Sequence, residues 1–134
     1  MSKARNLGTS QPFTWLARLR SFGFALQGIA FMLRTQHNAW LHLAVSLLVI
    51  GAAVFYRLSS NEWCWLIAAM AMVWMAETMN TAVEYLCDVV APHYSLAVKH
   101  AKDIAAGGVL MAATGAAAIG AITFWPHVRG GLLS

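Results

Sequence analysis

An apolar run from residue 63 to residue 90 carries three carboxylates, and this run constrains the fold more than any other feature of the chain. As a helix it would be about 42 Å long, which exceeds the roughly 30 Å of a bilayer's hydrocarbon core. Glu77, Glu84 and Asp88 follow one another at steps of seven and four, so they share one helix face. Because an ionisable group at membrane depth costs on the order of 2.5–3.5 kcal/mol, this row predicts a functional site.

The composition indicates a membrane protein. The chain is 60% hydrophobic and 10% charged, with a mean hydropathy of +0.61, whereas soluble domains carry roughly 25% charged residues. Its 134 residues predict a single all-α domain of three transmembrane helices plus an amphipathic surface helix. The net charge of +4 comes from scattered Lys and Arg residues, so it does not predict nucleic-acid binding.

The expected elements follow in chain order. Residues 1–12 form a polar tail, and residues 13–35, where apolar residues recur every three or four positions between arginines, form the surface helix. A signal peptide is the alternative for this region, but no small-x-small cleavage site follows it. Transmembrane helices are expected at 39–56, 63–90 and 104–125, with a polar connector at 91–103 and with Pro92 and Pro126 as helix ends. The third span has small residues at every fourth position, which predict close helix packing: Gly108, Ala112, Ala116 and Gly120.

The basic residues predict the orientation of the chain in the membrane. With the amino terminus in the cytoplasm and the carboxyl terminus outside, only Arg57 and Arg129 lie outside. The remaining basic residues then lie on the cytoplasmic side, as the positive-inside rule favours: Lys3, Arg5, Arg18, Arg20, Arg34, Lys99 and Lys102. The open end of the carboxylate row would therefore face cytosolic nucleotide.

The polar residues near this open end fit the needs of phosphoryl transfer. Carboxylates are needed to hold Mg²⁺, a cation to bind phosphate, and a base beside the acceptor hydroxyl. The chain supplies candidates for each role in Glu77, Glu84, Asp88, Asp103, Lys99 and Lys102. It has no Walker A motif and no protein-kinase glycine loop. An ion or proton conduit and a metal site remain alternatives for the same residues.

One motif resembles a known family. The string Glu77-x-x-Asn80-Thr81-Ala82-x-Glu84-x-x-x-Asp88, followed by Lys102-Asp103 and Ala105-Ala106-Gly107, is similar to that of the small bacterial membrane lipid kinases, the prokaryotic diacylglycerol kinase and undecaprenol kinase family. The resemblance extends from about Arg20 into the third span. It implies a homotrimer in the bacterial cytoplasmic membrane that transfers the γ-phosphate of ATP, with Mg²⁺, to a lipid alcohol. Diacylglycerol and undecaprenol are both credible acceptors, and the Asn-Thr-Ala string slightly favours undecaprenol.

The resemblance also implies roles for individual residues. Glu77 matches the catalytic carboxylate, the presumed general base, and Glu84 matches a metal ligand that bridges to the nucleotide. Asn80, Thr81 and Asp88 are supporting active-site polar residues. The implied nucleotide-binding set is Glu84, His93, Tyr94, Ser95, Lys102, Asp103 and Arg20. The chain departs from the family at Gln36, where a second metal-binding glutamate is usual; a neutral amide supplies an oxygen but no charge.

Simpler interpretations stand beside these roles. Glu77 could be a protonated carboxyl that holds subunits together, and Lys102 an ordinary positive-inside anchor. The histidines favour interfacial hydrogen bonding over metal or haem ligation, although a cofactor anchor is a rival function. The two cysteines, Cys64 and Cys87, lie about 35 Å apart on one expected helix, too far apart for a disulfide.

Overall fold

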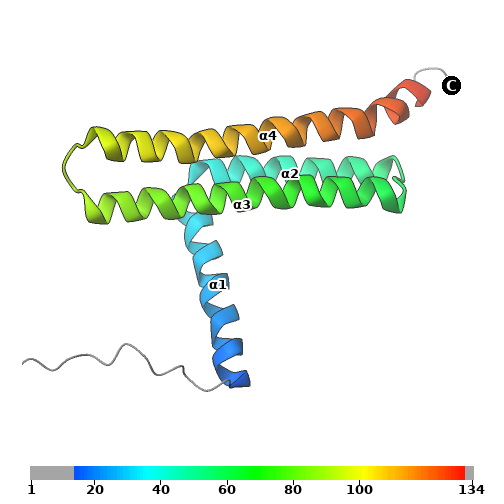
Figure 1. Ribbon diagram of the computed structural model, residues 1–134. Coiled ribbons are helices and arrows are strands. Elements are labelled where there is room, and N and C mark those ends of the chain that lie inside the picture. The colour runs from blue at the N-terminus through cyan, green and yellow to red at the C-terminus, as the bar shows by residue number, and fades with distance from the viewer. Residues whose placement is uncertain (1–13, 132–134) are drawn as a thin grey trace, which may run out of the picture.

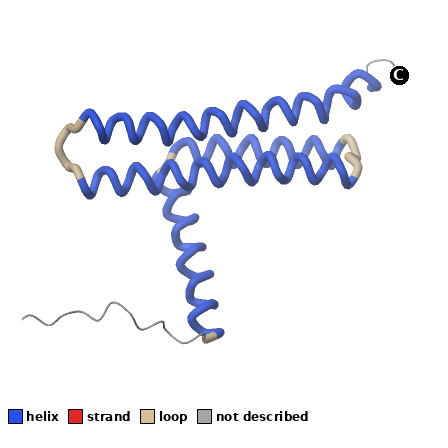
Figure 2. The backbone as a smooth tube through the Cα atoms, in the orientation of Figure 1, coloured by secondary structure: helices blue, strands red, loops and turns tan. Residues whose placement is uncertain are grey.

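The computed structural model describes residues 14–131, and within them the chain forms four helices and no strand. The helices are α1 (Trp15–Thr35), α2 (His37–Phe55), α3 (Ser60–Val90) and α4 (Leu96–Gly131). Figures 1 and 2 show α2, α3 and α4 side by side, while α1 leaves this bundle crosswise. The all-α prediction is confirmed for these residues. The expected tail at 1–12 lies outside them.

Three of the helices, α2, α3 and α4, are each long and apolar enough to cross a membrane. The protein is therefore a multi-pass membrane protein, as the hydropathy predicts. Many large apolar side chains lie on the outside of the bundle; Leu48, Val54 and Ile122 are all more than 60% exposed. In a bilayer such side chains face hydrocarbon or other subunits.

Helix α3 begins three residues earlier than the expected span, at Ser60. A capping box explains this start: the Ser59 hydroxyl accepts from the Glu62 backbone N–H, and the Glu62 carboxylate accepts from the Ser59 backbone N–H at 2.7 Å. This arrangement satisfies two backbone donors that a helix start leaves free. Residues 60–62, which precede the expected span, thus form the first turn of α3.

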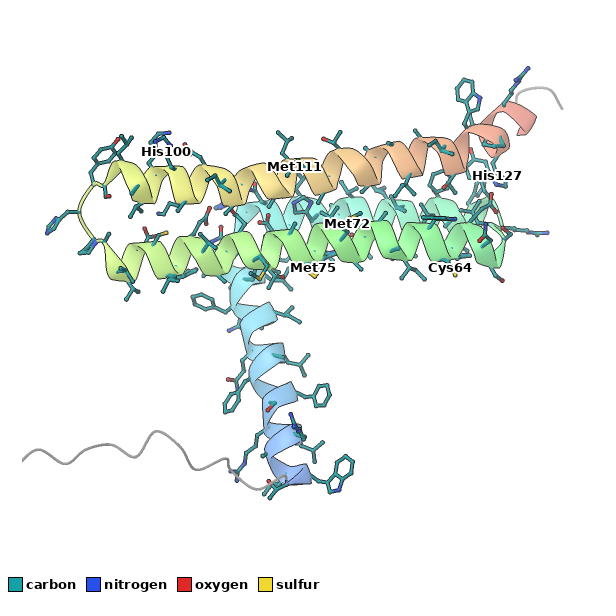
Figure 3. The ribbon with its side chains drawn as sticks, in the orientation of Figure 1. Cys64, Met72, Met75, His100, Met111 and His127 are labelled. Atoms are coloured by element: carbon teal, nitrogen blue, oxygen red, sulfur yellow. The ribbon has the colours of Figure 1, made fainter. Side chains whose placement is uncertain are left out.

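Helix α4 is longer than the expected span at both ends, because it starts at Leu96 and continues through Pro126 to Gly131. At its start, Lys99 and Asp103 form an i,i+4 ion pair of 2.5 Å, a spacing that stabilises an exposed helical turn. At its end, His127 Nε2 lies 2.7 Å from Glu62 Oε1, which ties the turn after Pro126 to α3 (Figure 3). The connector is therefore shorter than expected, at 91–95 instead of 91–103, while the helix end expected before Pro92 is found at Val90. The expectation of a helix end at Pro126 was wrong.

A cluster of buried hydrophobic residues lies at the end of the bundle where α2 turns into α3. Ala53, Leu58 and Leu66 are buried there, with Trp63 and Phe124 against them. Elsewhere α4 packs mainly on α3. A side chain added at Gly108 or Gly120 would meet nothing within 4 Å, so within one chain the small residues of α4 do not make the close helix contact that their spacing predicts.

Helix α1 contacts the bundle through its last turns. Met32 is 3% exposed and its sulfur accepts from the Thr78 hydroxyl of α3 at 3.7 Å, while Phe31 packs on Tyr85 with ring centroids 5.1 Å apart. The first turns of α1 extend away from the bundle (Figure 1). The break between α1 and α2 at Gln36 therefore lies against the carboxyl-terminal half of α3, where Gln36 contacts Glu84.

Candidate active site

One face of α3 carries buried polar residues in the middle of the apolar bundle. Glu77 is 1% exposed, and Asn80 and Thr81 are each 6% exposed. Their spacing of three and four residues puts them on a single helix face, as the sequence predicts. Each has one buried oxygen without a hydrogen-bond partner: Glu77 Oε2, Asn80 Oδ1 and Thr81 Oγ1. Buried polar atoms are seldom left unpaired in folded proteins, so these oxygens indicate a site built for something outside the chain.

Glu77 makes an ion-pair contact with His42 of α2. His42 Nε2 lies 3.7 Å from Glu77 Oε2, and the histidine side chain is 15% exposed. This distance is too long for a hydrogen bond, yet it is short enough for a strong electrostatic interaction away from water.

Contacts between α2 and α3 hold His42 in place. Trp74 Nε1 donates to Ser46 Oγ at 3.1 Å, and Ser46 Oγ donates to the His42 carbonyl oxygen at 2.7 Å. The Trp74 ring also packs against the His42 ring, with centroids 6.4 Å apart. His42 was not among the residues predicted for the site. His42 lies three residues after Ala39 and four residues before Ser46. This spacing places all three residues on one face of α2 and could have indicated His42 from the sequence.

Glu84 lies two turns beyond Glu77 and is held by two amides. Asn80 Nδ2 donates to Glu84 Oε1 at 3.2 Å, and Gln36 Nε2 donates to Glu84 Oε2 at 3.4 Å. Gln36 reaches Glu84 because it is the residue between α1 and α2, where the backbone is extended. The structure therefore brings together the two residues that the resemblance assigns to a metal ion, although they are far apart in the sequence.

A second polar cluster lies where α3 and α4 meet their connecting loop. Lys102 Nζ lies 2.5 Å from Asp88 Oδ1, and Lys99 pairs with Asp103. Lys102 and Asp103 thus do not pair with each other, because neighbouring residues point about 100° apart around a helix. A cavity of about 330 Å³ is lined by these four side chains together with Tyr94 and Ser95.

Two predicted nucleotide contacts are not part of this cluster within one chain. His93 lies in the loop between α3 and α4 but does not line the cavity. Arg20 lies in the first half of α1, which extends away from the bundle (Figure 1). The other predicted residues fall into two adjacent groups, one around Glu77 and Glu84 and one around Asp88 and Lys102.

The donor atoms around Glu84 suit a hard cation such as Mg²⁺, which prefers oxygen ligands. A carboxylate, two amide side chains and unpaired buried oxygens lie on this face of α3. Within residues 14–131, however, no group of three or more His, Cys, Asp or Glu side chains converges. The residues therefore fit an ion that arrives with further ligands, since Mg²⁺ is usually bound by one or two carboxylates plus substrate phosphates.

Comparisons with known proteins agree on one family. The family model for prokaryotic diacylglycerol kinase matches residues 23–124, which include all of α2 and α3 and most of α4. A diacylglycerol kinase of Synechocystis sp. is 35% identical over 109 residues, which are 81% of this chain and 62% of the relative. An undecaprenol kinase of Bacillus subtilis is 32% identical over 109 residues, or 81% of this chain and 89% of that relative. The chain thus spans less than two thirds of the length of the Synechocystis relative.

Proposed function

The chain belongs to the prokaryotic diacylglycerol kinase family, and on this premise we propose that it transfers the γ-phosphate of ATP to the hydroxyl of a membrane lipid alcohol. One observation carries the proposal beyond the family: Glu77 is buried in an apolar helix with an unpartnered oxygen. Two turns away, the two oxygens of Glu84 accept from the amides of Asn80 and Gln36, and each keeps a further lone pair with which to bind a cation. A proton acceptor and an ion site on one face are the parts that phosphoryl transfer to an alcohol needs.

Glu77 is the proposed general base. Its free Oε2 accepts the proton of the lipid hydroxyl as the oxygen attacks the γ-phosphate. His42, 3.7 Å away, borders the place where the lipid hydroxyl would approach Glu77. Asn80 lies one turn from both glutamates and already donates to Glu84, so it fixes the position of Glu84 relative to the base.

Glu84 is the proposed ligand of Mg²⁺ bound together with ATP. When bound, the ion neutralises charge on the phosphates during transfer. Rotation of the Gln36 amide would present its oxygen, and not its N–H, to the same ion. The pair Glu84 and Gln36 therefore supplies one charge where two carboxylates would supply two.

Lys102 and the loop residues are the proposed nucleotide contacts. The Lys102 side chain is 34% exposed and its partner Asp88 is 66% exposed, so phosphate oxygens can reach the ammonium group. Tyr94, Ser95 and Asp103 line the same cavity. His93 and Arg20 would complete the set only if the loop and α1 approach bound nucleotide, in the same subunit or in a neighbour.

We place the site at the cytoplasmic surface of the bacterial inner membrane, in a homotrimer, with the amino terminus inside and the carboxyl terminus outside. Three features support this placement. Helix α1 carries Arg18, Arg20 and Arg34, and it leaves the bundle crosswise (Figure 1) from Gln36, which contacts Glu84. From Glu84 to its end at Val90, α3 continues for about 9 Å, which would bring the loop into the cytosol. The exposed apolar surface of α3 and α4 leaves room for other subunits.

The acceptor is the first property to test. Purified protein in vesicles, given γ-labelled ATP and Mg²⁺, is expected to label diacylglycerol or undecaprenol, and an equimolar mixture of the two shows which is preferred. Counting label in the organic phase after separation of the two products gives the ratio. Equal labelling would mean that the chain does not discriminate, and labelling of neither lipid would contradict the proposed function.

Replacing Gln36 by Glu is expected to lower the Mg²⁺ concentration for half-maximal activity by about tenfold, because ligand charge sets the affinity for hard cations. Without Mg²⁺ the new carboxylate lies close to Glu84, so like-charge repulsion should lower the thermal stability, and added Mg²⁺ should restore it. Gln27→Glu makes the same change at an exposed position of α1 and serves as the control. An unchanged Mg²⁺ requirement in Gln36→Glu would exclude Gln36 from the ion site.

A further inference from the structure

Glu77 has to lose a proton once in every turnover if it acts as the base. It takes this proton from the acceptor hydroxyl, and it can serve the next acceptor only after the proton has left. Glu77 is 1% exposed on an apolar helix, so water does not reach it directly. Its buried polar neighbours on the same face, Asn80 and Thr81, carry an amide and a hydroxyl, which are not bases at ordinary pH. The proton therefore needs another route out of the bundle.

His42 is the side chain placed to take this proton. Its Nε2 lies 3.7 Å from Glu77 Oε2, the oxygen that has no hydrogen-bond partner. Among residues 14–131, no second basic side chain forms an ion-pair contact with Glu77. Because N···O hydrogen bonds span roughly 2.7–3.2 Å, a side-chain shift of about 0.5–1 Å would join the two groups. Until then the gap leaves Oε2 available to the acceptor hydroxyl.

The surroundings of His42 suit a group that passes a proton on. Its side chain is 15% exposed, whereas that of Glu77 is 1% exposed, so His42 is the member of the pair that reaches the surface of the bundle. The bonds of Ser46 and Trp74 hold its turn of α2 against α3. The residues of α4 that line a cavity together with His42 are alanine, glycine and phenylalanine, so among the described residues no charge faces it from that helix.

We propose that His42 takes the proton from Glu77 after each phosphoryl transfer and passes it to water. This proposal rests on the proposed function and adds a second residue to its proton path. Glu77 first gains the hydroxyl proton as the bond from the lipid oxygen to phosphorus forms and the bond to ADP breaks. The O–H bond of Glu77 then breaks, and the proton moves to the Nε2 lone pair of a histidine that carries its other hydrogen on Nδ1. The same proton leaves Nε2 for water, and both side chains return to their starting forms.

The test separates the first turnover from those that follow. Wild type, His42→Gln and the control His127→Gln are mixed in vesicles with γ-labelled ATP, Mg²⁺ and acceptor, and the reaction is quenched at times from milliseconds to minutes. His127 lies at the other end of the bundle, where it contacts Glu62 (Figure 3). Glutamine can donate to the same carboxylate there, so this control changes a histidine without touching the site.

His42→Gln is expected to complete its first turnover at the wild-type rate and then to turn over about 10²-fold more slowly, the scale of a lost proton-transfer group. His127→Gln should follow wild type in both phases. His42→Ala leaves space for a free base, so added imidazole should restore its steady-state rate without changing its first turnover. If His42→Ala fails to assemble, the slow phase of His42→Gln is compared in H₂O and D₂O, because a phase limited by proton transfer is slower in D₂O.

Three results would overturn the proposal. Equal slowing of the first and later turnovers would mean that His42 only maintains the shape of the site. Unchanged kinetics would mean that the proton leaves by another route, such as on the phosphate of the product. A slow phase that responds neither to imidazole nor to D₂O would identify slow product release. Failure of the wild type to label any lipid would instead contradict the proposed function.

Discussion

Glu77→Gln is expected to lower kcat by about 10²–10⁴-fold, the usual contribution of a positioned general base, with the KM for ATP unchanged. Glutamine has nearly the same shape and can occupy the same place on the buried face of α3. It cannot take a proton from the lipid hydroxyl. Because Glu77 lies deep in the bundle at 1% exposure, no water replaces it easily as the acceptor. Initial rates of label transfer to lipid in vesicles measure the effect.

The control for this variant is another carboxylate of the same helix. Glu62 lies at the opposite end of α3, where it accepts hydrogen bonds from Ser59 and contacts His127. Glu62→Gln is expected to keep most of the activity, whatever it does to thermal stability. Both variants should elute with wild type in size-exclusion chromatography. Normal turnover by Glu77→Gln would remove Glu77 from the role of base and would favour a carboxyl that only holds the helices together.

Glu84→Gln is expected to reduce kcat/KM for MgATP by roughly 10–100-fold, the usual loss on weakening a metal site. The amide oxygen can still accept from one of the two amides, Asn80 or Gln36, and the new NH2 group can donate to the other once that amide turns its oxygen inward. The local structure should therefore persist while the charge is lost. Higher Mg²⁺ should restore part of the activity of Glu84→Gln but none of that of Glu77→Gln. This difference separates the loss of an ion ligand from the loss of a base.

Asp88→Asn is the matched comparison for Glu84→Gln, one turn further along α3. It breaks the ion pair with Lys102, which is largely exposed, and exposed pairs contribute little to stability. Its effect should appear in the KM for ATP and not in the Mg²⁺ requirement. If Glu84→Gln and Asp88→Asn showed the same dependence on Mg²⁺, Glu84 would not be the ion ligand.

The helices could be predicted from the sequence because hydropathy and helix length are local properties. Helix ends were less predictable, since they depend on contacts that form only in the fold. Pro126 suggests the end of a helix, but α4 continues beyond it, and His127 is held there by its contact with Glu62. Likewise, the charged residues at 99–103 suggest a loop, but the structure shows that Lys99 and Asp103 form an i,i+4 ion pair within a helix.

The sequence was sufficient to predict the site residues that lie on one face of a single helix. The spacing of Glu77, Asn80 and Glu84 defines that face without any tertiary information. Periodicity does not say which residues of another helix lie opposite, so the contact of His42 with Glu77 and the pairing of Lys102 with Asp88 required the structure. Gln36 was identified by the resemblance alone, and the structure adds that its amide lies beside Glu84.

The most direct test of the account follows the phosphate itself. Vesicles that contain the purified chain and the lipid acceptor are given ATP labelled at either the α- or the γ-phosphate, with and without Mg²⁺, and ion flux is recorded in parallel without nucleotide. The account predicts that only the γ-label moves to the lipid, only with Mg²⁺, and that no flux occurs. Label in neither diacylglycerol nor undecaprenol, together with a nucleotide-independent ion flux, would contradict it and identify the buried carboxylates as the lining of a conduit.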